Sequence, residues 1–261
     1  MSEEILIVEY LEGGICRLTL NRPDRMNALT LPLLRSLKET VENLRFNREV
    51  RVVLITGAGE KAFCAGADLK ERVTMTPDQV KVFVRTIRDT FTAIENLNKP
   101  TIAVVNGVAL GGGTELALAC DIRVIGQGAT MGLTETSLGI IPGAGGTQRL
   151  PRLVGKGRAK DLILTARRVG ADEALRIGLA EYSFSNEQLQ NEAEAIARRI
   201  AANAPLALEQ AKFAVDKGLE MDIASALDVE LKCYELIIPT QDRLEGLKAF
   251  AEKRSPVYKG E

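Results

Sequence analysis

Histidine is absent from this 261-residue chain. Nucleophile machinery of the Ser-His-Asp or Cys-His kind therefore cannot be built from this chain alone. Any acid–base chemistry would fall to carboxylates, of which the chain has 35.

Cysteine is scarce, and neither sign of charge dominates. The cysteines Cys16, Cys64, Cys120 and Cys233 are far apart and form no CxxC pair, so we expect neither a metal site nor a disulfide framework. With 34 basic and 35 acidic residues and no long run of one sign, the chain lacks the features of a nucleic-acid-coating or membrane-surface protein.

Long apolar runs are also missing. No stretch reaches the roughly eighteen apolar residues of a membrane span, and the acidic start at Ser2, Glu3 and Glu4 matches neither a signal nor a transit peptide. We therefore expect a soluble, cytoplasmic protein with no membrane partner.

Periodicity predicts a mixed α/β first part and a helical last part. A hairpin opens the chain, Thr30 can cap the first helix, and Pro77 can begin a long second one. The residues from 131 to 151 form an irregular, glycine-rich passage, and the pattern is mostly helical from about Gly157 onward. The expected strands of the first half span 5–10, 15–20, 52–56, 101–105 and 121–125.

The stretch TIAVVNGVALGGGTELALACD, at 101–121, changes periodicity twice. Its first five residues suit a strand buried on both faces, and residues 114–120 suit a short buried helix that follows a glycine triplet. The first amides of a helix lack intrahelical acceptors and carry the positive end of its dipole. This segment would therefore direct N–H groups at an anion.

Glu115 stands in the first turn of that apolar helix. A carboxylate that is buried and unpaired there costs on the order of several kcal/mol. A simpler interpretation is that Glu115 only complements the helix dipole, which is worth roughly 0.3 to 1 kcal/mol. Taken alone, the position leaves both interpretations open.

Three separated motifs, in this order, resemble the enoyl-CoA hydratase/isomerase (crotonase) family: FCAGADLKER at 63–72, NGVALGGGTELALACDIRV at 106–124 and TETSLGIIPGAGGTQRLPR at 134–152. The resemblance extends to the C-terminal segment 239–261. It is closest to the branch that contains methylglutaconyl-CoA hydratase, some members of which also bind AU-rich RNA.

The resemblance implies an α/β fold, with a spiral of strand–strand–helix units over residues 1–196 and a C-terminal helical trimerisation region over 197–261. It implies assembly into homotrimers that commonly pair into homohexamers. No cofactor is implied, because coenzyme A is part of the acyl-CoA substrate. Fatty acid metabolism or branched-chain amino acid degradation is the expected context.

The resemblance also implies the site residues. The catalytic carboxylates are Glu115 and Glu135, and the backbone amides of Ala67 and Gly112 form the oxyanion hole. The residues that line the acyl-CoA site are Ala67, Asp68, Leu69, Lys70 and Gly112. Without the resemblance, Glu135 would be a polar residue of an exposed loop and Ala67–Asp68 part of an ordinary tight turn. Lys70, Glu71 and Arg72 either form a solvated face or offer basic groups to the phosphates of the substrate.

These groups suit the syn addition of water across the 2,3 double bond of a 2-enoyl-CoA thioester. Negative charge develops on the thioester oxygen, where two fixed amides can stabilise it. One carboxylate can activate water while a carboxylic acid supplies the α-proton. We expect Glu115 to hold the water and Glu135 to be the principal acid and base, although the sequence leaves open which glutamate delivers which proton.

Two other functions fit these residues less well. A Δ3,Δ2-enoyl-CoA isomerase on the same fold needs a base but no bound water, so the presence of both glutamates favours hydration. An RNA-binding protein is disfavoured, because the early helical segment 31–51 mixes its cations with Glu39, Glu42 and Glu49. The acyl group is expected to be short or branched. An acidic one such as methylglutaconyl would need a cation that the sequence does not single out.

Overall fold

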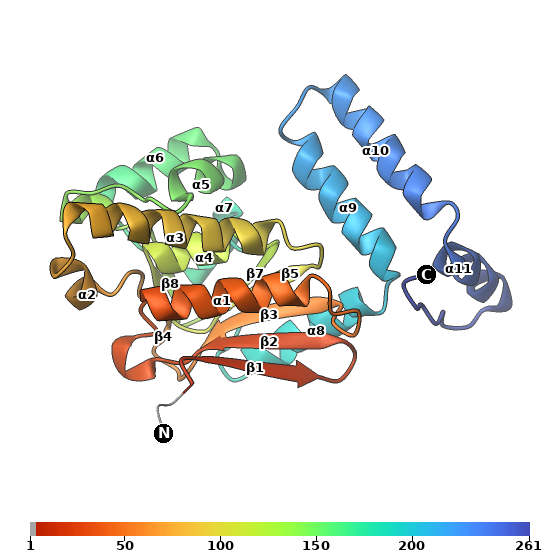
Figure 1. Cartoon of the computed structure of the whole chain (residues 1–261), viewed down its shortest axis with the longest axis horizontal. Helices are drawn as coiled ribbons and strands as arrows, with labels where there is room; N and C mark the ends of the chain where they lie inside the picture. The colour runs from red at the N-terminus through yellow and green to blue at the C-terminus, as the bar shows by residue number, and fades with distance from the viewer. Residues whose placement is uncertain (1–3) are drawn as a thin grey trace.

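Two β-sheets form the centre of the computed structural model, which describes residues 4–261 (Figure 1). The six-stranded sheet has the order β1-β2-β3-β5-β7-β10, and the four-stranded sheet has the order β4-β6-β8-β9. The strands of the larger sheet are β1 (Leu6–Leu11), β2 (Ile15–Leu20), β3 (Val52–Gly57), β5 (Thr101–Val105), β7 (Ile122–Gly126) and β10 (Tyr182–Phe184). Those of the smaller sheet are β4 (Ala62–Cys64), β6 (Val108–Leu110), β8 (Thr130–Gly132) and β9 (Val169–Gly170).

Consecutive strands alternate between the two sheets. The chain passes from β3 to β4, from β5 to β6 and from β7 to β8, each time leaving the larger sheet for the smaller one. Helices follow all three pairs: α2 (Leu69–Val73) and α3 (Pro77–Glu95) come after β4, α4 (Gly112–Leu118) comes after β6, and the chain is helical again after β8. This is the expected spiral of strand–strand–helix units, and the α/β fold class is confirmed.

The opening hairpin and the two early helices match the sequence closely. β1 begins one residue later than expected and pairs antiparallel with β2. The remaining neighbours in the larger sheet, from β2 to β10, are parallel. Thr30 caps α1 (Leu31–Leu44) by accepting a hydrogen bond from the Leu33 amide. Thr76 and Gln79 form a reciprocal capping box at the start of α3.

The larger sheet is covered on both faces. α1, α3 and α4 contribute to the main core on one face, whereas α8 (Leu189–Ala201) packs on the other against residues such as Leu54 and Val104. This double burial explains the continuous apolar runs of β3 and β5. The boundary expected between residues 196 and 197 falls inside α8, and the division into two domains stays a prediction.

The passage from 131 to 151 is more regular than expected. It contains the end of β8, the 3₁₀ turn η2 (Glu135–Leu138) and the start of α5 (Gly146–Val154). The prediction of an irregular passage was therefore wrong for α5, because its glycine-rich start and the internal Pro151 conceal a helix. The remaining elements of the body are η1 (Pro23–Arg25), α6 (Lys156–Thr165) and α7 (Ala171–Ile177).

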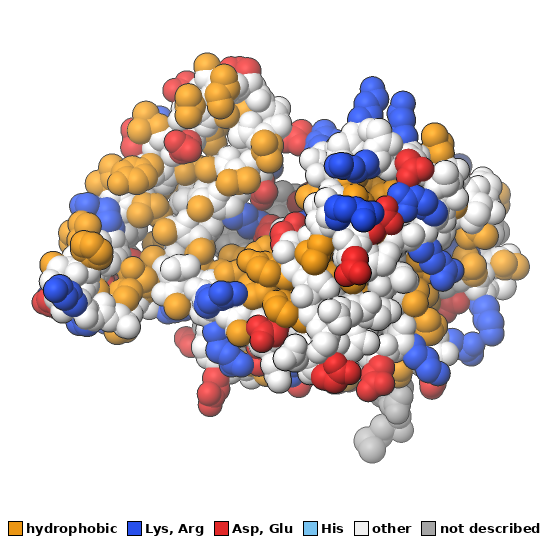
Figure 2. Space-filling model, turned by 180° about the vertical axis from the view of Figure 1, so that it is seen from behind, with side chains coloured by type: hydrophobic (Ala, Val, Ile, Leu, Met, Phe, Trp, Pro, Cys, Tyr) orange, Lys and Arg blue, Asp and Glu red, His pale blue; other side chains and the backbone are white. Residues whose placement is uncertain are grey.

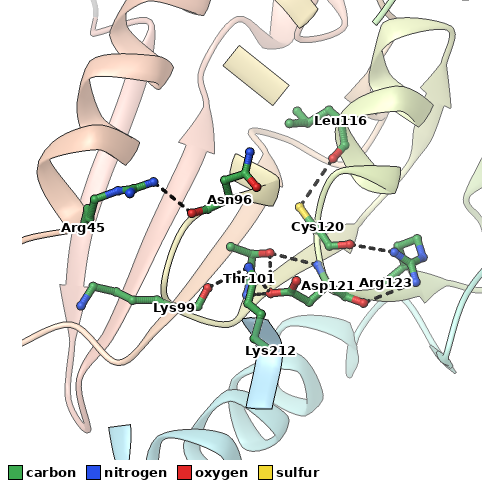
Figure 3. Close-up of polar contacts among 9 residues, drawn as sticks. All are labelled: Arg45, Asn96, Lys99, Thr101, Leu116, Cys120, Asp121, Arg123 and Lys212. Atoms are coloured by element: carbon green, nitrogen blue, oxygen red, sulfur yellow. Dashed lines mark hydrogen bonds and ion pairs between the residues drawn. The ribbon is translucent and has the colours of Figure 1, made fainter. Parts of the chain in front are cut away.

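The last three helices extend from the body as an arm: α9 (Pro205–Gly218), α10 (Ile223–Ile237) and α11 (Gln241–Glu252) (Figure 1). The Lys212 ammonium of α9 ties the arm to the body, at 2.8 Å from Asp121 Oδ2 and 3.2 Å from the Lys99 carbonyl oxygen (Figure 3). Asp121 also accepts from the Thr101 amide and hydroxyl, at 2.7 and 3.0 Å. Apolar side chains are widespread on the arm surface in Figure 2.

All four cysteines are buried as free thiols. Cys16 lies in β2, Cys64 in β4 and Cys233 in α10, while Cys120 follows α4. Within residues 4–261, every helix is too short or too polar to cross a membrane.

Candidate active site

The glycine triplet shapes the turn that leads into α4. Gly111 has φ 51° and ψ −120°, a backbone conformation that residues with a Cβ rarely adopt. A Cβ on Gly113 would collide with the Cys64 carbonyl oxygen of β4. The glycines therefore let the first turn of α4 lie directly against β4, and all seven residues of this helix are buried.

The two backbone amides that the family pattern assigns to the oxyanion hole, those of Ala67 and Gly112, lie near this turn. Leu29 donates to the Gly66 carbonyl oxygen at 2.8 Å and accepts from the Asp68 amide at 2.9 Å. The N–H of Ala67 belongs to the same trans peptide group as the Gly66 carbonyl and points in the opposite direction, so it points away from Leu29. Gly66 packs against the start of α4, where a Cβ on it would lie 3.2 Å from the Gly112 nitrogen. The amide of Gly112, the first residue of α4, has no intrahelical acceptor.

Ala67 and Gly112 line one cavity of about 760 Å³. Its wall is largely apolar, and its charged residues are Glu115, Glu135 and Arg72. The apolar side chains come mainly from α2, α3, η2 and the segment just after η2: Leu69, Val80, Phe83, Val84, Ile87, Leu138, Ile140 and Ile141. A concave apolar site with a few convergent polar groups is typical of a small-molecule site.

Glu115 is 3% exposed and is held by the loop that precedes α5. Its Oε1 accepts hydrogen bonds from the amides of Ala144 and Gly146, both at 2.8 Å. Among the described residues, no donor contacts its other oxygen. Burial raises the pKa of Glu115, while the two amides and the charge of Arg149 oppose that rise. Glu115 is therefore buried and hydrogen-bonded to a distant segment, so it does more than complement the dipole of α4.

Glu135 is the first residue of η2 and is also largely buried. Its Oε2 has no hydrogen-bond partner among residues 4–261. The carboxylate lies against Gly111, because a Cβ on that glycine would be 3.1 Å from Glu135 Oε1. Burial, and then repulsion from Glu115, raise the pKa of Glu135 to about 7. Repulsion between the two groups favours one charged and one neutral carboxyl near neutrality.

The other predicted site residues differ in whether they line the cavity. Leu69 lines the cavity, whereas Asp68 and Lys70 are not part of its wall. The Asp68 side chain caps α2 and pairs with Arg22 at 3.0 Å. Lys70 is exposed.

The cations of α1 are partly engaged with the protein itself. Lys38 pairs with Glu42 at 3.7 Å. Arg45, just after the helix, donates to the Asn96 carbonyl oxygen at 3.0 Å (Figure 3). The ion pair partly offsets the charge of Lys38, and the hydrogen bond holds the Arg45 side chain against the protein.

Two arginines have places in the site that the sequence did not predict. Arg72 lines the cavity, with its guanidinium 5.1 Å from the centroid of the Phe83 ring. Arg149 lies behind the loop that holds Glu115 and donates to the Ala144 carbonyl oxygen at 2.8 Å. Both lie in the quoted motif segments, but neither spacing nor periodicity distinguishes them from surface arginines.

Comparisons with known proteins agree with this geometry. A sequence model described as enoyl-CoA hydratase/isomerase matches residues 11–261. A relative named putative enoyl-CoA hydratase/isomerase YngF, from Bacillus subtilis, is 55% identical over 260 residues, which cover 100% of both chains. Human mitochondrial methylglutaconyl-CoA hydratase is 46% identical over 267 residues, covering 100% of this chain and 79% of that protein. A crystal structure of enoyl-CoA hydratase from Bacillus anthracis has 51% identity and a TM-score of 0.98, covering 99% of this chain and 100% of that one.

Proposed function

Since the chain belongs to the enoyl-CoA hydratase/isomerase family, we propose that it adds water in syn fashion across the 2,3 double bond of a 2-enoyl-CoA thioester. One observation carries the proposal. Two buried carboxyl groups line the same apolar cavity as Ala67 and Gly112, the two residues whose backbone amides the family pattern assigns to the oxyanion hole.

The amides of Ala67 and Gly112 form the proposed oxyanion hole. Ala67 forms a β-bridge with Leu29, and Gly112 begins a buried helix, so regular structure holds both amides. Fixed donors of this kind stabilise the charge that develops on the thioester oxygen, and loss of one typically costs about 10²- to 10³-fold in rate. Gly112 also allows the thioester a close approach.

The two glutamates divide the remaining work. Glu115 has one oxygen occupied by two amides and keeps the other to hold and activate the water. Glu135, with a pKa of about 7, can exchange a proton near neutral pH and is assigned as the principal acid and base. The reaction needs no cofactor, because coenzyme A enters as part of the substrate.

The acyl group is proposed to be short or branched, with methylglutaconyl as the acidic candidate. Among the described residues, Arg72 is the only cation that lines the cavity. An acyl carboxylate in this otherwise apolar space would need such a partner. The human relative named methylglutaconyl-CoA hydratase supports this choice by similarity.

The central test follows the loss of enoyl-thioester absorbance with crotonyl-, longer enoyl- and methylglutaconyl-CoA. We expect hydration by the wild type, and losses of about 10²- to 10⁴-fold in kcat for Glu115→Ala and Glu135→Ala. Glu220→Ala is the matched control, because Glu220 is exposed and pairs with Arg152 on the surface. Near-normal turnover by Glu135→Gln would contradict the assignment.

The same panel separates the alternatives. A Δ3,Δ2-enoyl-CoA isomerase would convert a 3-enoyl thioester faster than it hydrates a 2-enoyl one. If the acyl group is acidic, Arg72→Met should lower kcat/KM for methylglutaconyl-CoA by about 10-fold or more and leave crotonyl-CoA turnover nearly unchanged. Equal effects on both substrates would remove Arg72 from the specificity proposal.

A further inference from the structure

Arg149 connects three parts of the chain behind the cavity. It lies near the start of α5, and its side chain is 14% exposed. Its Nε and Nη2 donate to the two oxygens of Glu95, the last residue of α3, at 2.8 and 2.6 Å. Its Nη1 donates to the Ala144 carbonyl oxygen at 2.8 Å. The guanidinium therefore joins the end of α3 to the loop before α5.

That loop is the one that holds Glu115. Ala144 donates its N–H to Glu115 and accepts from Arg149 through its carbonyl oxygen. Gly145 has φ 111°, which lets the amides of Ala144 and Gly146 converge on one carboxylate oxygen. A Cβ on Gly145 would collide with the Arg149 guanidinium. The turn and the arginine thus fit each other closely.

We propose that Arg149, fixed by its fork-like pairing with Glu95, is a positioning residue for Glu115. By holding the loop 144–146, it keeps both amides directed at one oxygen of Glu115 and leaves the other oxygen for the reaction. Arg149 does not line the cavity, so it acts through the loop and not on the substrate. The catalytic part of this inference rests on the proposed hydratase function.

Arg149 also acts through its charge. The charged groups around Glu115 are Glu135 on η2, Arg149 on α5 with its partner Glu95 at the end of α3, and Arg72 of α2 on the cavity wall. The strands that pack against α4, namely β4, β5 and β6, carry no charged residue. The charge of Arg149 lowers the pKa of Glu115, so removal of that charge should raise it.

The test compares Arg149→Met with Arg149→Lys in crotonyl-CoA hydration across pH. In Arg149→Met, we expect kcat to fall by about 10- to 100-fold with little change in KM, because displacement of the Glu115 carboxyl group slows the chemical step. The acid limb of the profile should move to higher pH, because Glu115 then takes up its proton at higher pH. Arg149→Lys keeps the charge without the fork, so it should restore the acid limb and only part of kcat.

Two further variants control for general damage. Arg152→Met, on the same helix, removes a surface pair with Glu220 at 3.1 Å and should leave kcat and the pH profile unchanged. Glu95→Gln should lower kcat modestly without moving the acid limb upward, because it removes a negative charge. If Arg149→Met does not fold, Arg149→Lys and Glu95→Gln still decide the question through kcat.

A readout without turnover separates this inference from the hydratase proposal. Carbon-13 NMR of labelled glutamate, with the Glu115 signal assigned by its loss in Glu115→Gln, follows the Glu115 titration directly. We expect an upward shift in Arg149→Met even if every thioester proves inert. A folded Arg149→Met with the wild-type Glu115 titration and wild-type kcat would overturn the inference.

Discussion

Glu135 keeps a carboxyl oxygen inside the protein without a hydrogen-bond donor among the described residues. Its pKa in the folded protein is about 7, against an ordinary value of 4.5. Between these two values, the folded chain retains a proton that the unfolded chain releases. This group therefore lowers stability as the pH rises from 4.5 to about 7, and the loss persists above pH 7.

Replacement of Glu135 by Gln should consequently stabilise the protein at alkaline pH while it removes activity. We expect a gain of about 1 to 2 kcal/mol in the free energy of unfolding at pH 8 that disappears towards pH 4.5. Urea titrations at both pH values measure it. Glu173→Gln is the control, because Glu173 pairs with Arg167 at the surface. An equal change at both pH values would show that ionisation is not the cause.

The site residues differ in how far the sequence reveals them. Glu115 and Glu135 could be named because each lies in a recognisable motif, and the structure brings both to one cavity. The role proposed for Arg149 could not be predicted, because it depends on a backbone carbonyl and on Glu95, which is 54 residues away in the chain. The contribution of Asp68 to the cap of α2 was likewise hidden by the family pattern.

At the scale of single elements, the packing of α4 against β4 depends on the absence of a side chain at Gly113. Gly113→Ala should destabilise the protein by about 2 kcal/mol or more, because neither backbone can move aside easily. Gly157→Ala is the matched control in α6, where an added Cβ meets nothing within 4 Å. It should change stability by less than about 1 kcal/mol, in the stabilising direction. Chemical denaturation of the two variants makes the comparison, and equal losses would contradict it.

Long elements with clear ends were predictable, and short ones were not. Thr30 and Thr76 mark helix starts that local chemistry fixes, so α1 and α3 begin where the sequence predicts. The strands of the smaller sheet are two or three residues long and leave no periodicity to detect. That sheet exists because the chain repeatedly crosses from one sheet to the other, which is a tertiary property.

For the whole molecule, the most conspicuous surface is the apolar exterior of the arm (Figure 2). Leu219 is 82% exposed, Ile223 75% and Phe250 88%. Exposed apolar surface on this scale marks an interaction site, as expected for the homotrimer or homohexamer that the family resemblance implies. A cytoplasmic location stays a prediction.

Sedimentation of the wild type should therefore give a species of about 85 or 170 kDa, three or six chains of 28.3 kDa. Phe250→Asp combined with Leu219→Asp should shift it towards monomer, because buried charges disfavour an apolar interface. Val73→Asp, at a position that is 86% exposed on α2, should leave the assembly intact. A wild-type monomer at micromolar concentration would refute the proposed assembly.

The buried cysteines offer a way to measure local unfolding in the body and in the arm separately. Burial raises the pKa of Cys16 to about 11 and those of Cys64 and Cys120 to about 12, so these thiols resist alkylation while the body stays closed. Cys233 is buried within the arm. The rate at which each thiol reacts with an alkylating reagent therefore reports how often its surroundings unfold locally. A faster rate at Cys233 would show that the arm unfolds locally while the sheets of the body stay folded.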